Sequence, residues 1–323
     1  MGKNNEAENM QRLFNKLDEQ DRISREIPLT LNPFDFYDRK LTIANNDLIR
    51  EFLMAKKLEG CTFETLDGYR VTITYFLKSI NKDITKITTQ DVRNFMMDYQ
   101  TTRDCKNITM DTMRRIYSSF FNWLEDENKI IKSPVRKIHH IKYEKIVKKP
   151  FTEEEIERLR DACPSIRELA IIDFLNSSGV RVSEFCRLDI DDIDFRVNEA
   201  VVFGKGMKER IVYFDAKAKL HLRDYLRTRN DCEDALFISQ NKPYKRLTRG
   251  GVEFIVKTIG EIAEVENCHP HRFRRTLATR LIDRGVPIEQ VQQLLGHTKI
   301  DTTLIYAQVN QNNVKLSHAK FCS

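Results

Sequence analysis

The sequence lacks any long apolar run. Of its 323 residues, 41% are hydrophobic and 32% are charged, a balance typical of a soluble protein. No segment approaches the roughly 20 consecutive apolar residues that a membrane-spanning helix needs. The opening residues, MGKNNEAENMQRLFNK, contain no signal-peptide stretch, and Glu6 stands where a myristoylation motif requires Ser or Thr. These absences predict a cytoplasmic protein with no membrane partner.

Paired cysteines are absent as well. The seven cysteines are odd in number and never form a CxxC pair; they are Cys61, Cys105, Cys163, Cys186, Cys232, Cys268 and Cys322. This pattern predicts reduced thiols and argues against a disulfide framework or a zinc site. The sequence also contains no P-loop and no carboxylate cluster suited to two-metal cleavage. We therefore expect no metal ion and no other cofactor.

Positive charge is concentrated in one stretch. The net charge of the chain is +6. Between Ile131 and Pro150 there are seven basic residues and one acid, Glu144, so this stretch alone carries 7 − 1 = +6. The basic residues are Lys132, Arg136, Lys137, Lys142, Lys145, Lys148 and Lys149. On charge alone, a solvated linker and a segment that lies across a phosphate backbone remain equally open.

Helical periodicity organises the chain from residue 41 to about residue 130. Apolar residues recur at helical spacing in three shorter groups and in a longer segment at 110–124. This pattern predicts a bundle of four helices. Aromatic residues such as Phe120, Phe121 and Trp123 are expected to form its core and not to stack on bases. Residues 1–40 are polar and mixed in charge, which predicts a flexible N-terminal arm.

A second domain is predicted from Phe151 onward, where Thr152 and Glu155 form a capping-box pattern. Helices are expected at 153–163, 166–177, 217–228, 248–264, 271–284, 288–295 and 301–308. Two β-rich runs at 200–203 and 211–214 predict a hairpin. We expect a mainly α chain with a small β-hairpin or sheet (α+β). Its parts are an arm at 1–40, a bundle at 41–130, a basic linker at 131–150, a second domain at 151–308 and a tail at 309–323.

Five short motifs in the second domain carry candidate functional side chains. Considered singly, each has an ordinary explanation: Arg181 can pair with Glu184, and Tyr306 can be a packing residue. His271 and Arg274 share one helix face, but such pairs are common on solvated faces. The motifs are Gly179-Val180-Arg181-Val182-Ser183-Glu184, Gly204-Lys205-Gly206, His271-Arg272-Phe273-Arg274, Leu294-Leu295-Gly296-His297 and Tyr306.

Together these motifs supply two guanidinium groups, two imidazoles, one ammonium and one phenol. A phosphodiester under attack gains negative charge, which two bidentate guanidinium groups neutralise in a fixed geometry. A phenol with a pKa near 10 is only about 0.1% ionised at pH 7 and needs a base. The set therefore suits attack on a phosphodiester by tyrosine without a metal ion.

The order of these motifs over about 150–310 resembles the tyrosine recombinase family of phage-type integrases. It looks closest to the Xer-like members and to those encoded by transposons or phages. The bundle at 41–130 is similar, by pattern and position, to that family's core-DNA-binding domain. The resemblance implies a two-domain DNA clamp with a recombinase catalytic domain. Residues 1–40 look too short for the folded arm-binding domain of some relatives, which favours the simpler two-domain type.

The resemblance also implies roles for single residues. Glu184 matches an acidic position that supports the first arginine of the family. Arg275 departs from the pattern, since many relatives have histidine there, but this position lies outside the catalytic set. The implied catalytic residues are Tyr306 as nucleophile, Arg181 and Arg274 as phosphate clamp, Lys205 as general acid, His271 as base and His297 as a phosphate ligand. Candidates for DNA-backbone contact are the seven basic residues of 131–150 together with Arg246, Arg249 and Arg272.

The implied activity is site-specific cutting and rejoining of double-stranded DNA through a 3′-phosphotyrosyl intermediate. Such an enzyme is expected to be a monomer or dimer when free and a homotetramer in the synaptic complex. A partner recombinase or accessory factor is possible, and the tail can dock in cis or in trans. The expected location is a prokaryotic cytoplasm, on the nucleoid when DNA is bound.

Two other functions remain open from the residues. A type IB topoisomerase shares the logic of the pocket and would relax DNA as a monomer. A DNA-binding regulator with vestigial catalytic residues is the alternative from another class, although the complete six-residue set argues against it. The target site, the direction of reaction and a chromosomal or mobile-element origin do not follow from the sequence.

Overall fold

The computed structural model describes residues 37–144, 148–204, 209–296 and Leu304. These residues form two compact units, one at 37–144 and one from 148 onward, and each has its own hydrophobic core. The first unit is helical; the second combines helices with a small antiparallel sheet. Within the described ranges, no helix has the length and apolar character that crossing a membrane requires.

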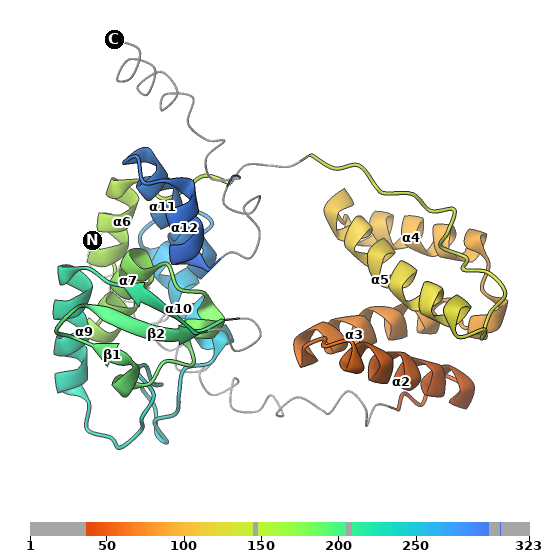
Figure 1. Cartoon of the computed structure of the whole chain (residues 1–323), viewed down its shortest axis with the longest axis horizontal. Helices are drawn as coiled ribbons and strands as arrows, with labels where there is room; N and C mark the ends of the chain where they lie inside the picture. The colour runs from red at the N-terminus through yellow and green to blue at the C-terminus, as the bar shows by residue number, and fades with distance from the viewer. Residues whose placement is uncertain (1–36, 145–147, 205–208, 297–303, 305–323) are drawn as a thin grey trace, which may run out of the picture. The chain divides into compact units, whose positions relative to one another are not determined.

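The first unit is built from four helices, in red to yellow in Figure 1. They are α2 (Ile43–Leu58), α3 (Phe63–Ile80), α4 (Thr89–Arg103) and α5 (Asn107–Asp126), with a short 3-10 turn, η1 (Ile84–Lys86), before α4. Thr42, Thr62 and Thr88 each accept a hydrogen bond from a first-turn backbone N–H. Side-chain caps of this kind explain why these helices begin where they do.

Aromatic side chains fill the core of this bundle. Phe52, Phe76, Phe120 and Phe121 are fully buried. The Phe52 and Phe120 rings meet edge to face with their centroids 5.1 Å apart, a favoured aromatic geometry. The prediction that these aromatics form a core is confirmed.

The chain from 133 to 142 lies along the bundle. The backbone N–H of Ser133 donates to Glu125 of α5 at 2.9 Å, and that of Ile141 donates to Asp111 of α5 at 3.1 Å. The side chain of Asn107 donates to the carbonyl of Lys142 at 3.0 Å. This part of the basic stretch is therefore anchored by its backbone, while its basic side chains point to solvent.

The second unit, in green to blue in Figure 1, has α7 (Ile166–Ser178) at its centre. Most residues of α7 are buried, as expected for a helix covered on all sides. It packs against the other helices α6 (Glu153–Asp161), α9 (Ala216–Thr228) and α11 (Pro270–Asp283). The remaining helices are α8 (Val182–Phe185), α10 (Arg249–Ile262) and α12 (Ile288–Leu295).

Three antiparallel strands form the sheet, in the order β1 (Ile193–Asp194), β2 (Glu199–Phe203) and β3 (Glu209–Tyr213). A 3-10 turn, η2 (Ile190–Asp192), precedes β1. The predicted hairpin is confirmed as β2–β3, with Val202 opposite Arg210. The two-residue β1 was too short to leave an alternating pattern in the sequence. Of the helix expected at 301–308, only Leu304 lies within the described residues.

Candidate active site

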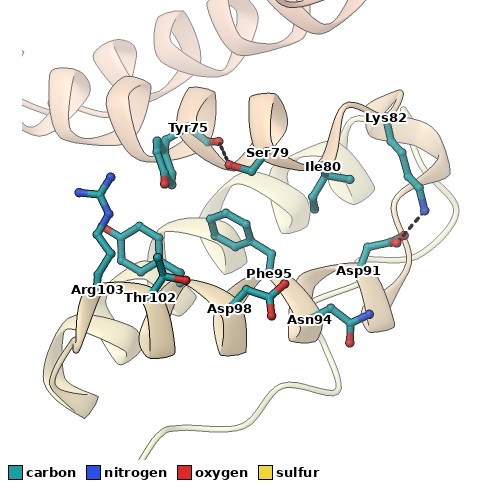
Figure 2. Close-up of a pocket in the computed structure, with 11 residues that line it drawn as sticks. Tyr75, Ser79, Ile80, Lys82, Asp91, Asn94, Phe95, Asp98, Thr102 and Arg103 are labelled. Carbon is teal, nitrogen blue, oxygen red and sulfur yellow. Dashed lines mark hydrogen bonds and ion pairs between the residues drawn. The ribbon is translucent and has the colours of Figure 1, made fainter.

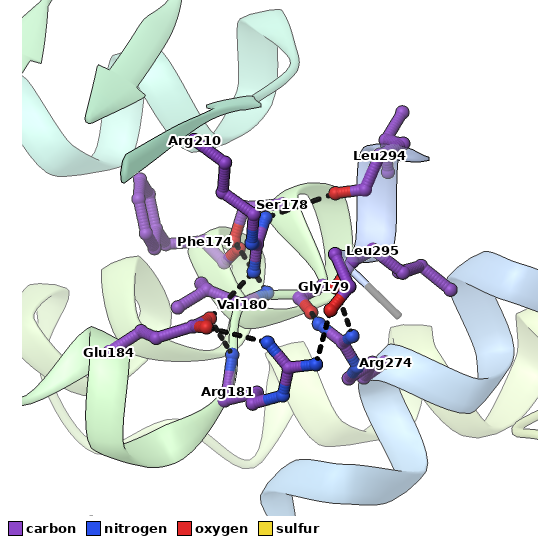
Figure 3. A network of polar contacts seen from close by, with 11 residues as sticks. Phe174, Ser178, Gly179, Val180, Arg181, Glu184, Arg210, Arg274, Leu294 and Leu295 are labelled. Atoms are coloured by element: carbon purple, nitrogen blue, oxygen red, sulfur yellow. Dashed lines mark hydrogen bonds and ion pairs between the residues drawn. The ribbon is translucent and has the colours of Figure 1, made fainter. Parts of the chain in front are cut away.

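The C-terminal end of α12 meets three arginines from three other elements (Figure 3). Arg210 Nη1 donates to the carbonyl of Leu294 at 3.0 Å, and Arg181 Nη2 donates to that of Gly296 at 2.8 Å. Arg274 Nη2 donates to the carbonyl between them, that of Leu295. The last carbonyls of a helix have no intrahelical donors and carry the negative end of its dipole. One helix end therefore orients three guanidinium groups.

Arg274 is the most deeply placed of the three, with 2% of its surface exposed. Its Nη1 donates at 2.8 Å to the carbonyl of Gly179, the residue that ends α7. Gly179 has a φ of +58°, and a Cβ there would lie 2.7 Å from Leu277 of α11. Only glycine combines this φ with so close an approach of α7 to α11. That approach sets Arg274 between two helix ends.

Arg181 lies at the N-terminus of α8, and Glu184 holds it twice. Glu184 accepts a bond from Arg181 Nη1 at 2.7 Å and another from its backbone N–H at 2.9 Å. The Arg181 side chain is still 36% exposed. The ordinary explanation of Arg181, a pair with Glu184, is therefore correct. The same pair also places Arg181 at the site.

Glu184 receives a second guanidinium from β3. Arg210 Nη2 donates at 2.6 Å to Glu184 Oε2, the oxygen that also accepts the backbone N–H of Arg181 (Figure 3). Burial alone would raise the pKa of Glu184, but the Arg210 charge and the bonds from Arg181 together hold it below its ordinary value. Glu184 is thus a buried carboxylate shared by two arginines.

Arg181 and Arg274 line a cavity of about 560 Å³ together with His271. Burial and, next in size, the nearby Arg275 and Arg274 charges together lower the pKa of His271 to about 4. The imidazole is therefore neutral at pH 7 and can accept a proton. Other lining residues include Ser183, Arg249, Glu253, Lys257 and His269.

The structure thus brings together four of the predicted residues, Arg181, Glu184, His271 and Arg274. The other three, Lys205, His297 and Tyr306, lie outside the described residues, and their roles remain predictions.

The candidate phosphate contacts differ in exposure. Lys132, Arg136, Lys137, Lys142, Lys148 and Lys149 are exposed, and Lys145 lies outside the described residues. Arg249 is exposed at the cavity, where it pairs with Glu253 at 2.8 Å. Arg246 is partly exposed and donates a hydrogen bond to the carbonyl of Leu188 at 3.0 Å.

Arg272 requires a correction. It turns inward, with its guanidinium carbon 3.9 Å from the Phe151 ring centre. It donates to Glu155 at 2.9 Å and to the carbonyl of Glu266 at 2.7 Å. Consecutive residues of a helix point about 100° apart, so Arg272 lies on a different face of α11 from His271, the face that packs against Phe151 and Glu155. We therefore withdraw Arg272 from the set of phosphate contacts.

A second cavity, of about 320 Å³, lies in the bundle between α3 and α4 (Figure 2). Its two basic side chains are already engaged. Lys82 pairs with Asp91 at 2.6 Å, and this contact together with hydrogen bonds from Thr88 lowers the pKa of the Asp91 carboxyl to about 2. Arg103 lies 5.5 Å from the Tyr75 ring centre. This cavity lacks the convergent arginines of the first one and is not the candidate site.

Arg210 is the main residue that the motifs missed. The signal was present in the alternation of β3, where Arg210, Val212 and Phe214 fall on the same face. Val212 and Phe214 are buried. A charged residue on the inward face of a strand is uncommon and marks a buried partner.

Comparison with known proteins identifies the family. The sequence profile of the Phage integrase family matches residues 149–313, and that of the phage integrase N-terminal SAM-like domain matches residues 48–130. The chain belongs to the phage integrase family.

Individual relatives cover most of the chain. Tyrosine recombinase XerC of Staphylococcus aureus strain RF122 is 30% identical over 283 residues, 84% of this chain and 94% of that protein. Tyrosine recombinase XerA of Pyrococcus horikoshii is 29% identical over 278 residues, again 84% of this chain and 93% of that protein.

Solved structures share the fold at lower identity. XerH recombinase bound to a palindromic difH substrate, a post-cleavage complex, aligns with a TM-score of 0.67 and 18% identity over 90% of this chain and 93% of that chain. A lambda integrase fragment in a dimer bound to a COC' core site aligns with a TM-score of 0.66 and 16% identity over 82% of this chain and 96% of that chain.

Proposed function

We propose that this protein is a site-specific tyrosine recombinase that cuts and rejoins double-stranded DNA through a 3′-phosphotyrosyl intermediate. One observation carries the proposal: Arg181, Arg274 and a neutral His271 line one cavity. Family membership supports it, as do two relatives named tyrosine recombinases that match over 84% of the chain. The proposed catalytic set is Tyr306, Arg181, Lys205, His271, Arg274 and His297, with Glu184 in support.

The arginines act on the phosphate. Attack by tyrosine places extra negative charge on the non-bridging oxygens of the phosphodiester. Arg181 and Arg274 face that charge from two different helices, and their geometry is set before DNA binds. Each such preorganised donor contributes about 3 kcal/mol of transition-state stabilisation. His297 adds a hydrogen bond to the same phosphate.

Two proton transfers accompany the exchange of bonds. The Tyr306 oxygen bonds to phosphorus, and its proton passes to His271, which is neutral at pH 7. The bond from phosphorus to the 5′-oxygen breaks, and Lys205 supplies the proton to that oxygen. Phosphoester bond energy is retained in the phosphotyrosyl bond, so a 5′-hydroxyl from a second cleaved strand can reverse the step. The chemistry uses neither ATP nor a metal ion.

Binding and assembly follow the same proposal. Both units and the basic residues of 131–150 contact one duplex, and four protomers form the synapse. The tail at 309–323 docks either on its own protomer or on a neighbouring protomer. Truncation at Asn310 distinguishes these two arrangements. The protein acts in the cytoplasm, on the nucleoid when bound to DNA.

A nicked suicide substrate tests the nucleophile. Tyr306→Phe lacks the phenolic oxygen, so it should bind DNA normally and give no covalent adduct on a denaturing gel. Tyr213→Phe is the matched control, since Tyr213 is exposed on β3, and it should form the adduct at the wild-type rate. An adduct that persists in Tyr306→Phe would falsify the assignment.

A plasmid that carries two target sites tests the reaction class. A recombinase converts it to deletion or inversion products. Relaxation without exchange would indicate a type IB topoisomerase instead, and binding without either product would indicate a DNA-binding regulator.

A further inference from the structure

Arg210 connects three parts of the second unit that are distant in sequence. It lies in β3, where it is 84 residues from Leu294 and 26 residues from Glu184. Its Nη1 holds the last turn of α12 at 3.0 Å, and its Nη2 holds Glu184 at 2.6 Å. Figure 3 shows Arg210 between these two partners, with its guanidinium above that of Arg181 in the view. Both Nη groups are therefore engaged with the protein.

Neighbouring residues pack closely against the Arg210 side chain. A Cβ on Gly296 would lie 2.7 Å from both its Cδ and its Nε. The Nε–H is buried and has no hydrogen-bond partner among the described residues. Burying a charge with one donor unsatisfied costs free energy. An arginine at this position makes the bonds to Glu184 and Leu294, which an apolar residue could not make.

We propose that Arg210 is a positioning residue for DNA strand cleavage, which it supports by holding Glu184 and the end of α12 in the geometry that orients Arg181. This inference rests on the proposed function. Arg210 does not touch the phosphate; it acts through two residues that contact Arg181. Glu184 holds the Nη1 and backbone N–H of Arg181, and the terminus of α12 holds its Nη2.

Loss of Arg210 changes both supports at once. Among the described residues, Glu184 then keeps Arg181 as its remaining side-chain partner, and the carbonyl of Leu294 loses the bond from Arg210. A clamp displaced by about 1 Å can cost on the order of a hundredfold in rate. Because the Arg210 charge helps to lower the pKa of Glu184, its removal also makes Glu184 easier to protonate. The acid limb of the cleavage rate then moves to higher pH.

A double-mutant cycle on the suicide substrate tests this. Arg210→Met should slow cleavage at saturating DNA by at least about tenfold, with DNA affinity unchanged. Arg181→Met should be slower still, and Arg210→Met in that background should add less than about twofold. The acid limb of Arg210→Met should lie at higher pH than that of the wild type. Effects that multiply, an unmoved acid limb or a normal rate for Arg210→Met would each overturn the proposal.

The control is Arg229→Met. Arg229 also joins a carboxylate, Asp231, to backbone carbonyls, including that of Leu236 at 3.3 Å, but it does not line the cavity. It should lower thermal stability and leave the rate per folded molecule unchanged. If Arg229→Met slows cleavage equally, lost fold stability explains the effect of Arg210→Met, and the proposal is wrong.

If Arg210→Met does not fold, Arg210→Lys takes its place. The ammonium cannot reach Glu184 and Leu294 in one fork, so cleavage should still fall by about threefold or more. A wild-type rate in Arg210→Lys would then count against the proposal. Failure of the proposed function has a separate signature, since the wild type itself would then form no adduct on the suicide substrate.

Discussion

Each of the three arginines at the end of α12 bridges two acceptors. Arg181 joins Glu184 to Gly296, Arg210 joins Glu184 to Leu294, and Arg274 joins Gly179 to Leu295. A planar fork can span two acceptors, whereas a lysine is a single point charge. For Arg181 the bonds of its side chain use two of the five guanidinium N–H donors. Its exposed part keeps donors for a phosphate.

His271 leads to a prediction about pH and stability. Its pKa is about 4 in the folded protein against an ordinary 6.5. The unfolded chain therefore binds the proton first, and the free energy of unfolding falls as pH drops from about 6.5 to about 4. Above about pH 7 both states are neutral at this residue and the effect vanishes.

His271→Gln should flatten this dependence in urea unfolding measured at about pH 7 and about pH 5. Part of the slope should remain, because burial lowers the pKa of His269 as well. Equal slopes in the wild type and the variant would show that His271 is not held neutral by the fold.

At the level of elements, the C-terminal end of α12 is the surface against which the Arg210 side chain packs. Gly296 ends the helix with a φ of +63° and leaves room for Arg210. This gives the glycine of the Leu294-Leu295-Gly296-His297 motif a physical reason. A side chain there would meet both backbone strain and the guanidinium that packs against it.

Gly285 is the matched control for this element. It follows the end of α11 with a φ of +84°, but a Cβ there would meet nothing within 4 Å. Gly285→Ala should cost only the left-handed strain, about 1 kcal/mol of unfolding free energy. Gly296→Ala should cost at least about 1 kcal/mol more.

Cleavage should separate the two variants more sharply. Gly296→Ala displaces Arg210 and should slow adduct formation by about tenfold or more, whereas Gly285→Ala should keep the wild-type rate. Equal rates per folded molecule would mean that the end of α12 does not transmit its geometry to the site.

For the whole molecule, the basic stretch predicts how DNA binding responds to salt. Its backbone is anchored along the bundle at Ser133 and Ile141, so its exposed lysines are displayed on a fixed path. A plot of log affinity against log salt has a negative slope. Replacing Lys132, Lys137 and Lys142 with Gln should make this slope less steep. The expected reduction is about 0.9 for each phosphate that the variant no longer neutralises.

The control replaces Lys217, Lys219 and Lys242 of the second unit with Gln. It removes the same charge outside the basic stretch, so a reduction confined to the first triple variant would assign the phosphate-binding role to that stretch. Equal slopes in both variants would mean that net charge alone drives binding.

Local patterns in the sequence predicted much of this molecule. Apolar spacing gave helices close to those observed, such as α9 at Ala216–Thr228 against an expected 217–228, and the Thr152 cap gave the start of α6 at Glu153. The two β-rich runs at 200–203 and 211–214 predicted the hairpin. These features depend on residues a few positions apart, and their period is visible without the fold.

Side-chain types and motif order also predicted the guanidinium groups of Arg181 and Arg274 and the imidazole of His271, which line the described cavity. The phenol of Tyr306 stays a prediction. Apart from the local pair of Arg181 with Glu184, the contacts of each group could not be predicted from the sequence. Arg181 meets Gly296 across 115 residues and Arg274 meets Leu295 across 21. Only contacts between distant elements decided that Arg272 turns inward, toward Phe151 and Glu155, and that Arg210 of β3 joins the site. Burial and partner choice depend on such contacts, which no local pattern encodes.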